Sequence, residues 1–366
     1  MLKPIFVYFC ATGIPEGLLN LNTRYYLTSD MRKQKWYRNL KIVSLLIVCV
    51  VLAGAGLQSS IAELLSPQRK ISAYGVLHTS RLTVGVDIWW GTTASKFVSQ
   101  GHASRMQECG IEMVRLQFDS SSVANLRTLV PVVVDNGIQV LGLLFRTDLA
   151  PDNEDAWGDW VYSVVNEFKQ YIKVWEIWNE PNLDKYFSGK DPVKYTNFLK
   201  RAYTEAKRAD PTCFILGGSI VFTHNTALNF LRAVYDNGGR DYMDALSYHP
   251  YCDPYAPTDT SSTPNPYIYL TRVRDVMVDY GEQDKTIWIT EVGWSANEDG
   301  QVGDEKQAQY LTEALEIARD WGWVETIIIY NWKDSATEGS STKGLLRGDL
   351  SPKPSFYAVQ SFTTPS

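Results

Sequence analysis

Apolar runs of strand length alternate with amphipathic stretches of helix length from residue 82 to the end of the chain. Most of these runs are continuously hydrophobic, which is typical of parallel strands covered on both faces. The pattern predicts strands over residues 82–88, 113–118, 138–145, 173–179, 213–218, 245–249, 286–290 and 325–331. Helices are predicted between them, among others over residues 157–172, 192–209 and 305–322, and a last helix within residues 351–362.

Repeated strand–helix units of about 35 residues predict the α/β class and a single (β/α)8 (TIM) barrel. This barrel domain is expected over residues 81–366. A doubly wound open sheet is the alternative architecture. It would require a Gly-rich phosphate-binding turn after the first strand, and the sequence has none there.

The N-terminal part has a different pattern. A basic stretch from Met31 precedes the apolar run of residues 42–57, and Ala53 and Ala55 form an A-x-A-like cleavage site. We interpret residues 1–57 as an extension followed by an export signal or membrane anchor, and residues 58–80 as a linker with a short helical piece. Residues 1–30 have no signal character, so Met31 is an alternative start. The barrel is expected outside the cell, secreted or anchored by residues 42–57.

Charge and composition narrow the function classes. Residues 1–60 hold seven Lys and Arg against two acidic residues, so the remainder is more acidic than the net charge of −6 indicates. An acidic domain argues against nucleic-acid binding. The 12 Trp and 21 Tyr are partly core residues, and some are expected to stack on sugar rings. The five Cys show no CxxC spacing, so neither a disulfide framework nor a metal site is predicted.

Two glutamates follow predicted strands at the positions where barrel enzymes carry their chemistry. Glu180 follows the fourth strand in WEIWNEPN, and Glu291 follows the seventh in WITEVGW. Because the carboxyl ends of barrel strands meet at one mouth, the two carboxylates should face each other. Such a pair can cleave a glycosidic bond with retention, one as proton donor and one as nucleophile. Structural ion pairing is the alternative for the pair, and Glu176, deeper in the barrel, is expected to form a structural salt bridge.

These motifs resemble clan A of the glycoside hydrolases, closest to family 39 and next to the cellulase-like enzymes of family 5. The resemblance implies that Glu180 is the general acid/base and Glu291 the nucleophile. It further implies that Arg115 keeps Glu291 ionised and that Asn179 binds the sugar 2-hydroxyl. His249 would lie near the sugar, and the hydroxyl of Tyr251 would support the nucleophile.

The resemblance also makes Trp332 the floor under the bound sugar. Trp89, Trp90 and Trp294 fall at strand ends as well and are expected to line the groove. No metal or cofactor is needed for this chemistry. The expected protein is a monomeric retaining β-glycosidase acting on oligo- or polysaccharides. The alternatives are a catalytically silent carbohydrate-binding barrel in polysaccharide assembly, and a transglycosylase that uses the same two carboxylates.

Overall fold

A computed structural model describes residues 69–71, 77–79, 81–88, 91–146, 153–261, 264–296, 302–335 and 341–364. Eight parallel strands close into a barrel in the order β10-β3-β4-β5-β6-β7-β8-β9. The strands are β3 (Thr83–Asp87), β4 (Met113–Phe118), β5 (Gln139–Leu144), β6 (Val174–Ile177), β7 (Phe214–Val221), β8 (Ala245–His249), β9 (Ile287–Val292) and β10 (Val324–Ile329). The predicted (β/α)8 barrel is therefore confirmed.

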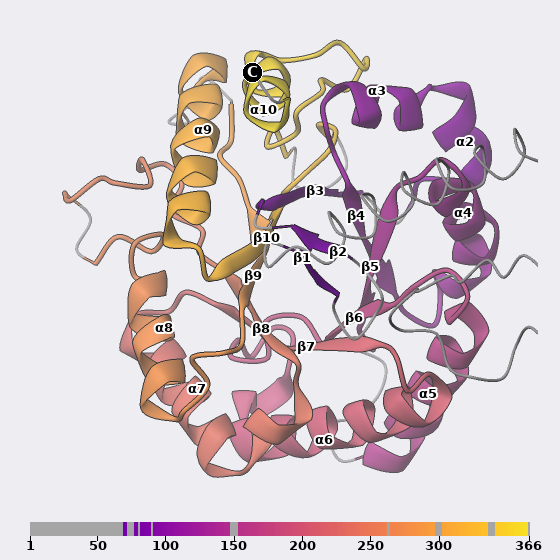
Figure 1. The fold of residues 1–366 in the computed structure, drawn as a ribbon, viewed down its shortest axis with the longest axis vertical. Helices are drawn as coiled ribbons and strands as arrows, with labels where there is room; N and C mark the ends of the chain where they lie inside the picture. Colours follow the sequence, from indigo (N-terminus) through magenta and orange to yellow (C-terminus); the bar gives the residue numbers. More distant parts are fainter. Residues whose placement is uncertain are drawn as a thin grey trace, which may run out of the picture. The chain divides into compact units, whose positions relative to one another are not determined.

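Helices surround these central strands (Figure 1). They are α2 (Ala94–Ser99), α3 (His102–Glu108), α4 (Val123–Asp135), α5 (Glu154–Phe168), α6 (Pro192–Ala209), α7 (Asn225–Asp236), α8 (Leu270–Asp279), α9 (Asp304–Trp321) and α10 (Pro354–Thr363), with short 3-10 turns η1 (Ser188–Lys190) and η2 (Gly239–Tyr242). Helix α6 has the predicted bounds. Its start is fixed locally, because the Asp191 side chain accepts hydrogen bonds from the amides of Val193 and Lys194 and Pro192 occupies the first turn.

Two more short strands, β1 (Arg69–Ile71) and β2 (Leu77–Thr79), pair antiparallel. They fall within residues 58–80, where a linker was expected, so this part of the linker forms paired strands. The predicted signal or anchor at residues 42–57 lies outside the described residues. Among the residues that are described, no helix combines the length and the apolar character needed to cross a membrane.

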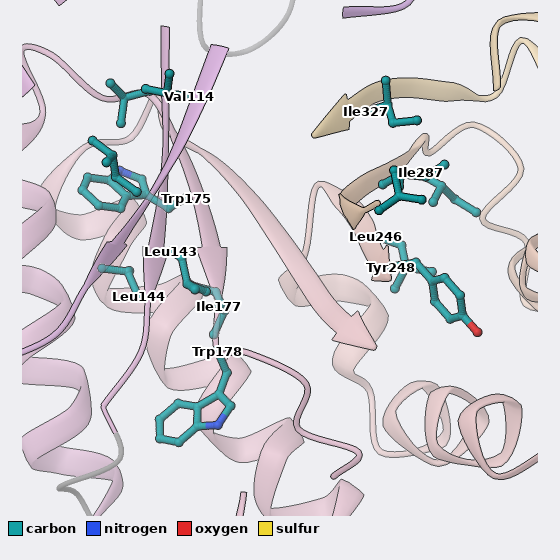
Figure 2. Packing of buried hydrophobic residues seen from close by; sticks show 14 of the residues in the cluster. Val114, Leu143, Leu144, Trp175, Ile177, Trp178, Leu246, Tyr248, Ile287 and Ile327 are labelled. Atoms are coloured by element: carbon teal, nitrogen blue, oxygen red, sulfur yellow. The ribbon is translucent and has the colours of Figure 1, made fainter. Parts of the chain in front are cut away.

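The strands bury apolar side chains on both faces, as the continuous hydrophobic runs predicted. Outward-facing side chains pack against the helices, for example Val114 and Trp175 on one side of the barrel and Leu246 and Ile287 on the other (Figure 2). A separate cluster fills the barrel interior and comes from the strands, namely Met113, Leu141, Val174, Leu216, Ala245, Trp288 and Ile328, with Phe214 packed against it. The interior is thus a packed core at this level and not a channel.

Candidate active site

Inward-facing positions change from apolar to polar along several strands towards their carboxyl ends. Two residues after the interior Met113 comes Arg115, and two after Val174 comes Glu176. The same step of two leads from Trp288 to Thr290 on β9. Because side chains alternate between the faces of a strand, these polar groups lie in the layer above the apolar interior. The sequence therefore builds a polar site on an apolar base at the carboxyl end of the barrel.

Arg115 is the centre of this polar layer and is only 2% exposed. Its guanidinium donates hydrogen bonds to Glu176 Oε2 (2.7 Å) and Asp87 Oδ2 (2.9 Å). It also donates to Glu291 Oε1 (2.6 Å) and Asn179 Oδ1 (3.1 Å). Burial disfavours the cation, yet the surrounding carboxylates outweigh it and raise the pKa of Arg115. The site thus has a permanent positive charge next to Glu291.

Glu291 is held in its ionised form. One carboxylate oxygen accepts from Arg115, and the other accepts from the hydroxyl of Tyr251 at 2.7 Å. Burial opposes the charged carboxylate, but the charges of His249 and Arg115 and these two hydrogen bonds outweigh it and lower the pKa of Glu291. A desolvated carboxylate with a lowered pKa has the properties of a nucleophile.

Glu180 reaches the mouth through an unusual backbone. Trp178 and Glu180 have positive φ angles of 70° and 44°, a region that costs non-glycine residues free energy. The Trp178 ring turns away from the barrel and packs on Trp157 and Phe198 of the helix layer (Figure 2). The amide of Glu180 donates to the carbonyl of Ser219 on β7 at 3.0 Å. Burial of the Trp178 ring and this hydrogen bond hold Glu180 in place.

Ser219 lies in an irregular part of β7, where the pairing with β8 shifts register between Gly217 and Ile220. Gly218 has a φ of 104°, and a Cβ there would lie 2.9 Å from the carbonyl oxygen of Ser247. The Ser219 amide donates to Ser247 Oγ at 2.7 Å. Bulges of this kind commonly re-aim groups next to active sites, and here the bulge presents the carbonyl that binds the Glu180 amide.

His249 connects the two glutamates. Its Nδ1 lies 2.9 Å from Glu180 Oε1 and 3.8 Å from Glu291 Oε2. Its Nε2 lies 3.1 Å from Thr290 Oγ1, and the Thr290 hydroxyl itself donates to Glu176 Oε1 at 2.6 Å. The Ser219 hydroxyl lies farther from Nε2, at 3.3 Å. Because the Thr290 proton is committed to Glu176, a hydrogen bond between Nε2 and Thr290 requires the proton of Nε2. A single further proton is then shared between Nδ1 and the carboxyl of Glu180.

The charge of the two glutamates also acts on the imidazole. Burial disfavours the imidazolium, but Glu291 and Glu180 outweigh it and raise the pKa of His249. The carboxyl group of Glu180 is therefore not in an apolar setting, although Trp178 precedes Glu180 by two residues in the sequence. A histidine that can hold or return a proton lies against it instead.

Glu180, His249 and Glu291 could in principle ligate a metal ion, since one ligand atom of each lies within 4.8 Å of the others. Each of these atoms already faces a protein partner, however. Both oxygens of Glu291 accept hydrogen bonds, and Glu180 shares a proton with His249. The nearby guanidinium of Arg115 would also repel a cation. This donor set suits proton transfer better than cation binding.

A cavity of about 310 Å³ opens above this layer. It is lined by Asp87, Ile88, Arg115, Gln117, Leu143, Phe145, Asn179, Glu180, Tyr186, Tyr251, Glu291 and Tyr330. Five of the residues predicted from the motifs thus meet at one pocket, namely Arg115, Asn179, Glu180, Tyr251 and Glu291. His249 is fully buried and lies against the two glutamates.

The two predicted tryptophans do not line this pocket. Trp332 is 1% exposed, and its indole donates to His102 Nδ1 at 3.0 Å. Trp294 is fully buried and donates to the carbonyl of Tyr255 at 2.8 Å. Both are packed within the core beside the mouth, so neither offers a face to a sugar in this pocket. Trp89 and Trp90 lie outside the described residues.

Aromatic side chains that the motifs did not single out line the pocket instead. Tyr330 follows β10, two residues after the interior Ile328, and its ring lies 6.4 Å from that of Tyr251. Phe145 and Tyr186 form an edge-to-face pair on another part of the wall. The motifs missed Tyr330, although the alternation of side chains along the strand could have indicated it, because it continues the inward face of β10.

Asp87 was also missed, although the same alternation could have indicated it. It ends β3 two residues after Gly85, and its carboxylate accepts a hydrogen bond from Arg115. Glu176 forms the buried salt bridge with Arg115 that was expected of it.

Comparison with known proteins agrees with this geometry. The sequence model of the family described as "Glycosyl hydrolase catalytic core" matches residues 152–357. A coniferin β-glucosidase from Pinus contorta is 24% identical over 144 residues, which are 33% of this chain and 27% of that enzyme. The chain therefore spans about a quarter of that curated relative.

Solved structures share the fold. A family 39 glycoside hydrolase from the gut symbiont Bacteroides cellulosilyticus WH2 is 22% identical with a TM-score of 0.62, covering 80% of this chain and 65% of that one. A monomeric β-xylosidase from Caulobacter crescentus CB15 is 17% identical with a TM-score of 0.62, covering 77% and 67%. At these identities the likeness establishes the fold, which is the barrel that the resemblance to clan A and family 39 implied. The chain belongs to the glycosyl hydrolase catalytic core family, a family of glycosidases.

Proposed function

We propose that the protein is a retaining β-glycosidase in which Glu291 is the nucleophile and Glu180 the general acid/base. The observation that carries this proposal is the spacing of the two carboxylates, whose nearest oxygens lie within 4.8 Å. Retaining glycosidases hold the pair about 5–5.5 Å apart, whereas inverting enzymes need about 6.5–9.5 Å to admit a water molecule between carboxylate and sugar. The spacing thus favours direct attack by a carboxylate.

The surroundings of each carboxylate support the division of roles. Glu291 receives two hydrogen bonds and two neighbouring positive charges, which favour the ionised form needed for attack. Glu180 receives none from Arg115 and instead shares a proton with His249. A carboxyl group with a proton close at hand suits donation to a leaving oxygen.

The reaction then follows in two displacements. Glu291 attacks the anomeric carbon while Glu180 gives its proton to the glycosidic oxygen, so the C–O bond to the leaving group breaks and a glycosyl ester forms. A water molecule next gives a proton to Glu180 and attacks the same carbon, which releases Glu291. Asn179, oriented by Arg115 through its Oδ1, keeps its amide nitrogen for the sugar 2-hydroxyl.

The β configuration is proposed from the names of similar proteins, a coniferin β-glucosidase and a β-xylosidase. Phe145, Tyr186 and Tyr330 supply aromatic surface for sugar rings. A silent carbohydrate-binding barrel is less well supported, because it would have no need for the ionised Glu291 or the proton shared by Glu180. Transglycosylation uses the same first step and differs in the acceptor.

The stereochemical course tests the mechanism. Aryl β-glycosides of glucose, xylose, mannose and galactose would be incubated with the purified barrel, and the anomeric proton of the first product followed by NMR. Retention predicts that the β-anomer appears first and mutarotates later. An α-anomer formed first would exclude the double displacement.

The acidic limb of the pH profile should report Glu291. Turnover needs this group ionised, so the rate falls as the pH drops through its pKa, which lies below the usual glutamate range. Tyr251→Phe removes a hydrogen bond to the ionised form and should therefore move the acidic limb of kcat/KM upward by about one pH unit.

Tyr186→Phe is the matched control, because Tyr186 lines the same pocket but its hydroxyl accepts a hydrogen bond from Lys185 and donates none to Glu291. It should leave the limb in place. An unchanged limb in Tyr251→Phe would show that another group controls it.

We further propose that residues 42–57 direct the catalytic domain out of the cell, either as a cleaved signal or as an anchor. The proposal is supported by the basic stretch and apolar run in the sequence. N-terminal sequencing of protein from the culture medium tests cleavage near Ala55. Protein that stays entirely in the cytosol would contradict both the cleaved signal and the membrane anchor.

A further inference from the structure

A second cavity of about 280 Å³ lies beside the catalytic pocket. It is lined by Ile88, Gly91, Thr92, Lys96, Gln100, His102, Asn331, Trp332, Lys333, Asp334, Ser335 and Gly348. Ile88 lines both cavities, and Asn331 directly follows Tyr330, which lines the catalytic one. The two cavities therefore meet along β3 and β10, and a chain of sugars could occupy both.

The second cavity carries uncompensated positive charge. Among the residues that the structure describes, neither the ammonium of Lys96 nor that of Lys333 has an ion pair or hydrogen bond. Asp334 is the acidic residue of the lining, and it is neutralised by Lys353 at 2.8 Å. In a domain with a surplus of acidic residues, two unpaired lysines in one hollow favour an anion.

The hydrogen-bond donors of the second cavity also favour an anion. Burial, and then the charges of Lys333 and Arg105, lower the pKa of His102 to about 4, so its imidazole is neutral. Nδ1 accepts from the Trp332 indole, which leaves Nε2 to donate to Gln100 Oε1 at 3.0 Å. These two hydrogen bonds orient the amide nitrogen of Gln100, and no described residue accepts a hydrogen bond from it.

One buried acceptor in the lining also lacks a partner. Asn331 is 3% exposed, and its Oδ1 has no hydrogen-bond partner among the described residues. A buried carbonyl oxygen without a donor is unfavourable, so a ligand hydroxyl at this position would be bound preferentially. The cavity thus combines an acceptor for a hydroxyl with ammonium and amide donors for an anion. A sugar that carries an acidic group offers both.

We propose that this cavity is a subsite for an anionic sugar residue of the substrate, bearing a carboxylate or a sulfate, next to the residue whose bond is cleaved. The role in substrate binding rests on the proposed glycosidase function. The catalytic pocket itself is unsuited to an anion, because the carboxylates of Asp87, Glu176, Glu180 and Glu291 outnumber the cationic groups of Arg115 and His249. A neutral sugar residue at the cleavage position and an acidic one in the second cavity, which is lined by Lys96 and Lys333, therefore match the charges of the two cavities.

Binding can be measured without turnover. The full barrel with Glu291→Gln would be titrated with methyl β-D-glucuronide, D-glucose 6-sulfate and, as the neutral control, methyl β-D-glucoside. The Trp332 indole NH resonance reports the cavity, because this group lies in its wall. We expect at least one of the two anionic probes to shift this resonance and to bind about tenfold more tightly than the glucoside. Their relative affinities distinguish a carboxylate from a sulfate subsite.

Substitutions then test the lysines. Lys96→Met and Lys333→Met should each weaken binding of the anionic probe about tenfold and leave the glucoside unaffected, whereas Lys333→Arg should retain it. Lys306→Met, an exposed lysine on α9 outside the cavity, is the control for a general charge effect. Equal binding of anionic and neutral probes, or full binding in both Met variants, would overturn the proposal. If the probe binds but Glu291 variants turn over normally, the proposed function fails while the anion site stands.

Discussion

Glu291→Ala should abolish turnover of every substrate, by roughly 10⁴-fold or more, because no covalent glycosyl-enzyme can form. Added azide is small enough to enter the space left by the carboxylate and to attack the anomeric carbon directly. It should restore cleavage of an activated β-glycoside and yield the α-glycosyl azide. Rate measurements with and without azide, followed by NMR of the product, check both statements.

We expect Glu291→Ala to keep the fold, and thermal unfolding tests this. In Glu291→Ala the buried Arg115 still has Asp87 and Glu176 as ionic partners, so its charge is not left unpaired. Wild-type-like unfolding together with lost turnover identifies a chemical defect. A β-azide from this variant would reverse the assignment of the two glutamates.

Glu180→Ala should slow the enzyme according to the leaving group. Dinitrophenyl glycosides need little protonation, so their first step should survive, whereas alkyl or sugar leaving groups should be slowed by about 10²–10⁴-fold. Azide can attack the glycosyl-enzyme in place of base-activated water, and it should give the β-azide. Burst kinetics and product NMR measure the two steps.

Asp184→Ala is a suitable control, because Asp184 is exposed just beyond Glu180 and outside the catalytic cavity. It should preserve the wild-type dependence on leaving group. If Glu180→Ala itself retained full activity on poor leaving groups, the acid would have to be sought elsewhere, with His249 as the next group to test.

The sequence predicted most of the barrel, because its parallel strands are buried on both faces and leave uninterrupted hydrophobic runs. It also indicated the proposed catalytic pair, since WEIWNEPN and WITEVGW end two of these runs. The strand pattern likewise placed Glu176 inside the barrel, where it now pairs with Arg115. These features depend on local periodicity, which is directly readable from the residues.

The place of the Trp332 side chain depended on information that periodicity does not contain. Trp332 lies after the end of β10, where strand alternation no longer determines direction, and its indole turns to His102. Tyr330 occupies the inward position instead. Similarly, the contact of His249 with Glu180 depends on the positive φ angles at Trp178 and Glu180, and a hydrophobic pattern does not indicate such angles.

The reacting groups come from the strands and their first following residues, whereas the lysine-lined cavity is built from the segments that follow β3 and β10. Each barrel strand is hydrogen-bonded on both sides, so the spacing of the reacting groups is set by the closed sheet and not by those segments. Substrate choice and bond cleavage are therefore separable parts of the chain. On the proposed function, exchanging these two connections would change the sugar that is bound and leave the reacting groups in place.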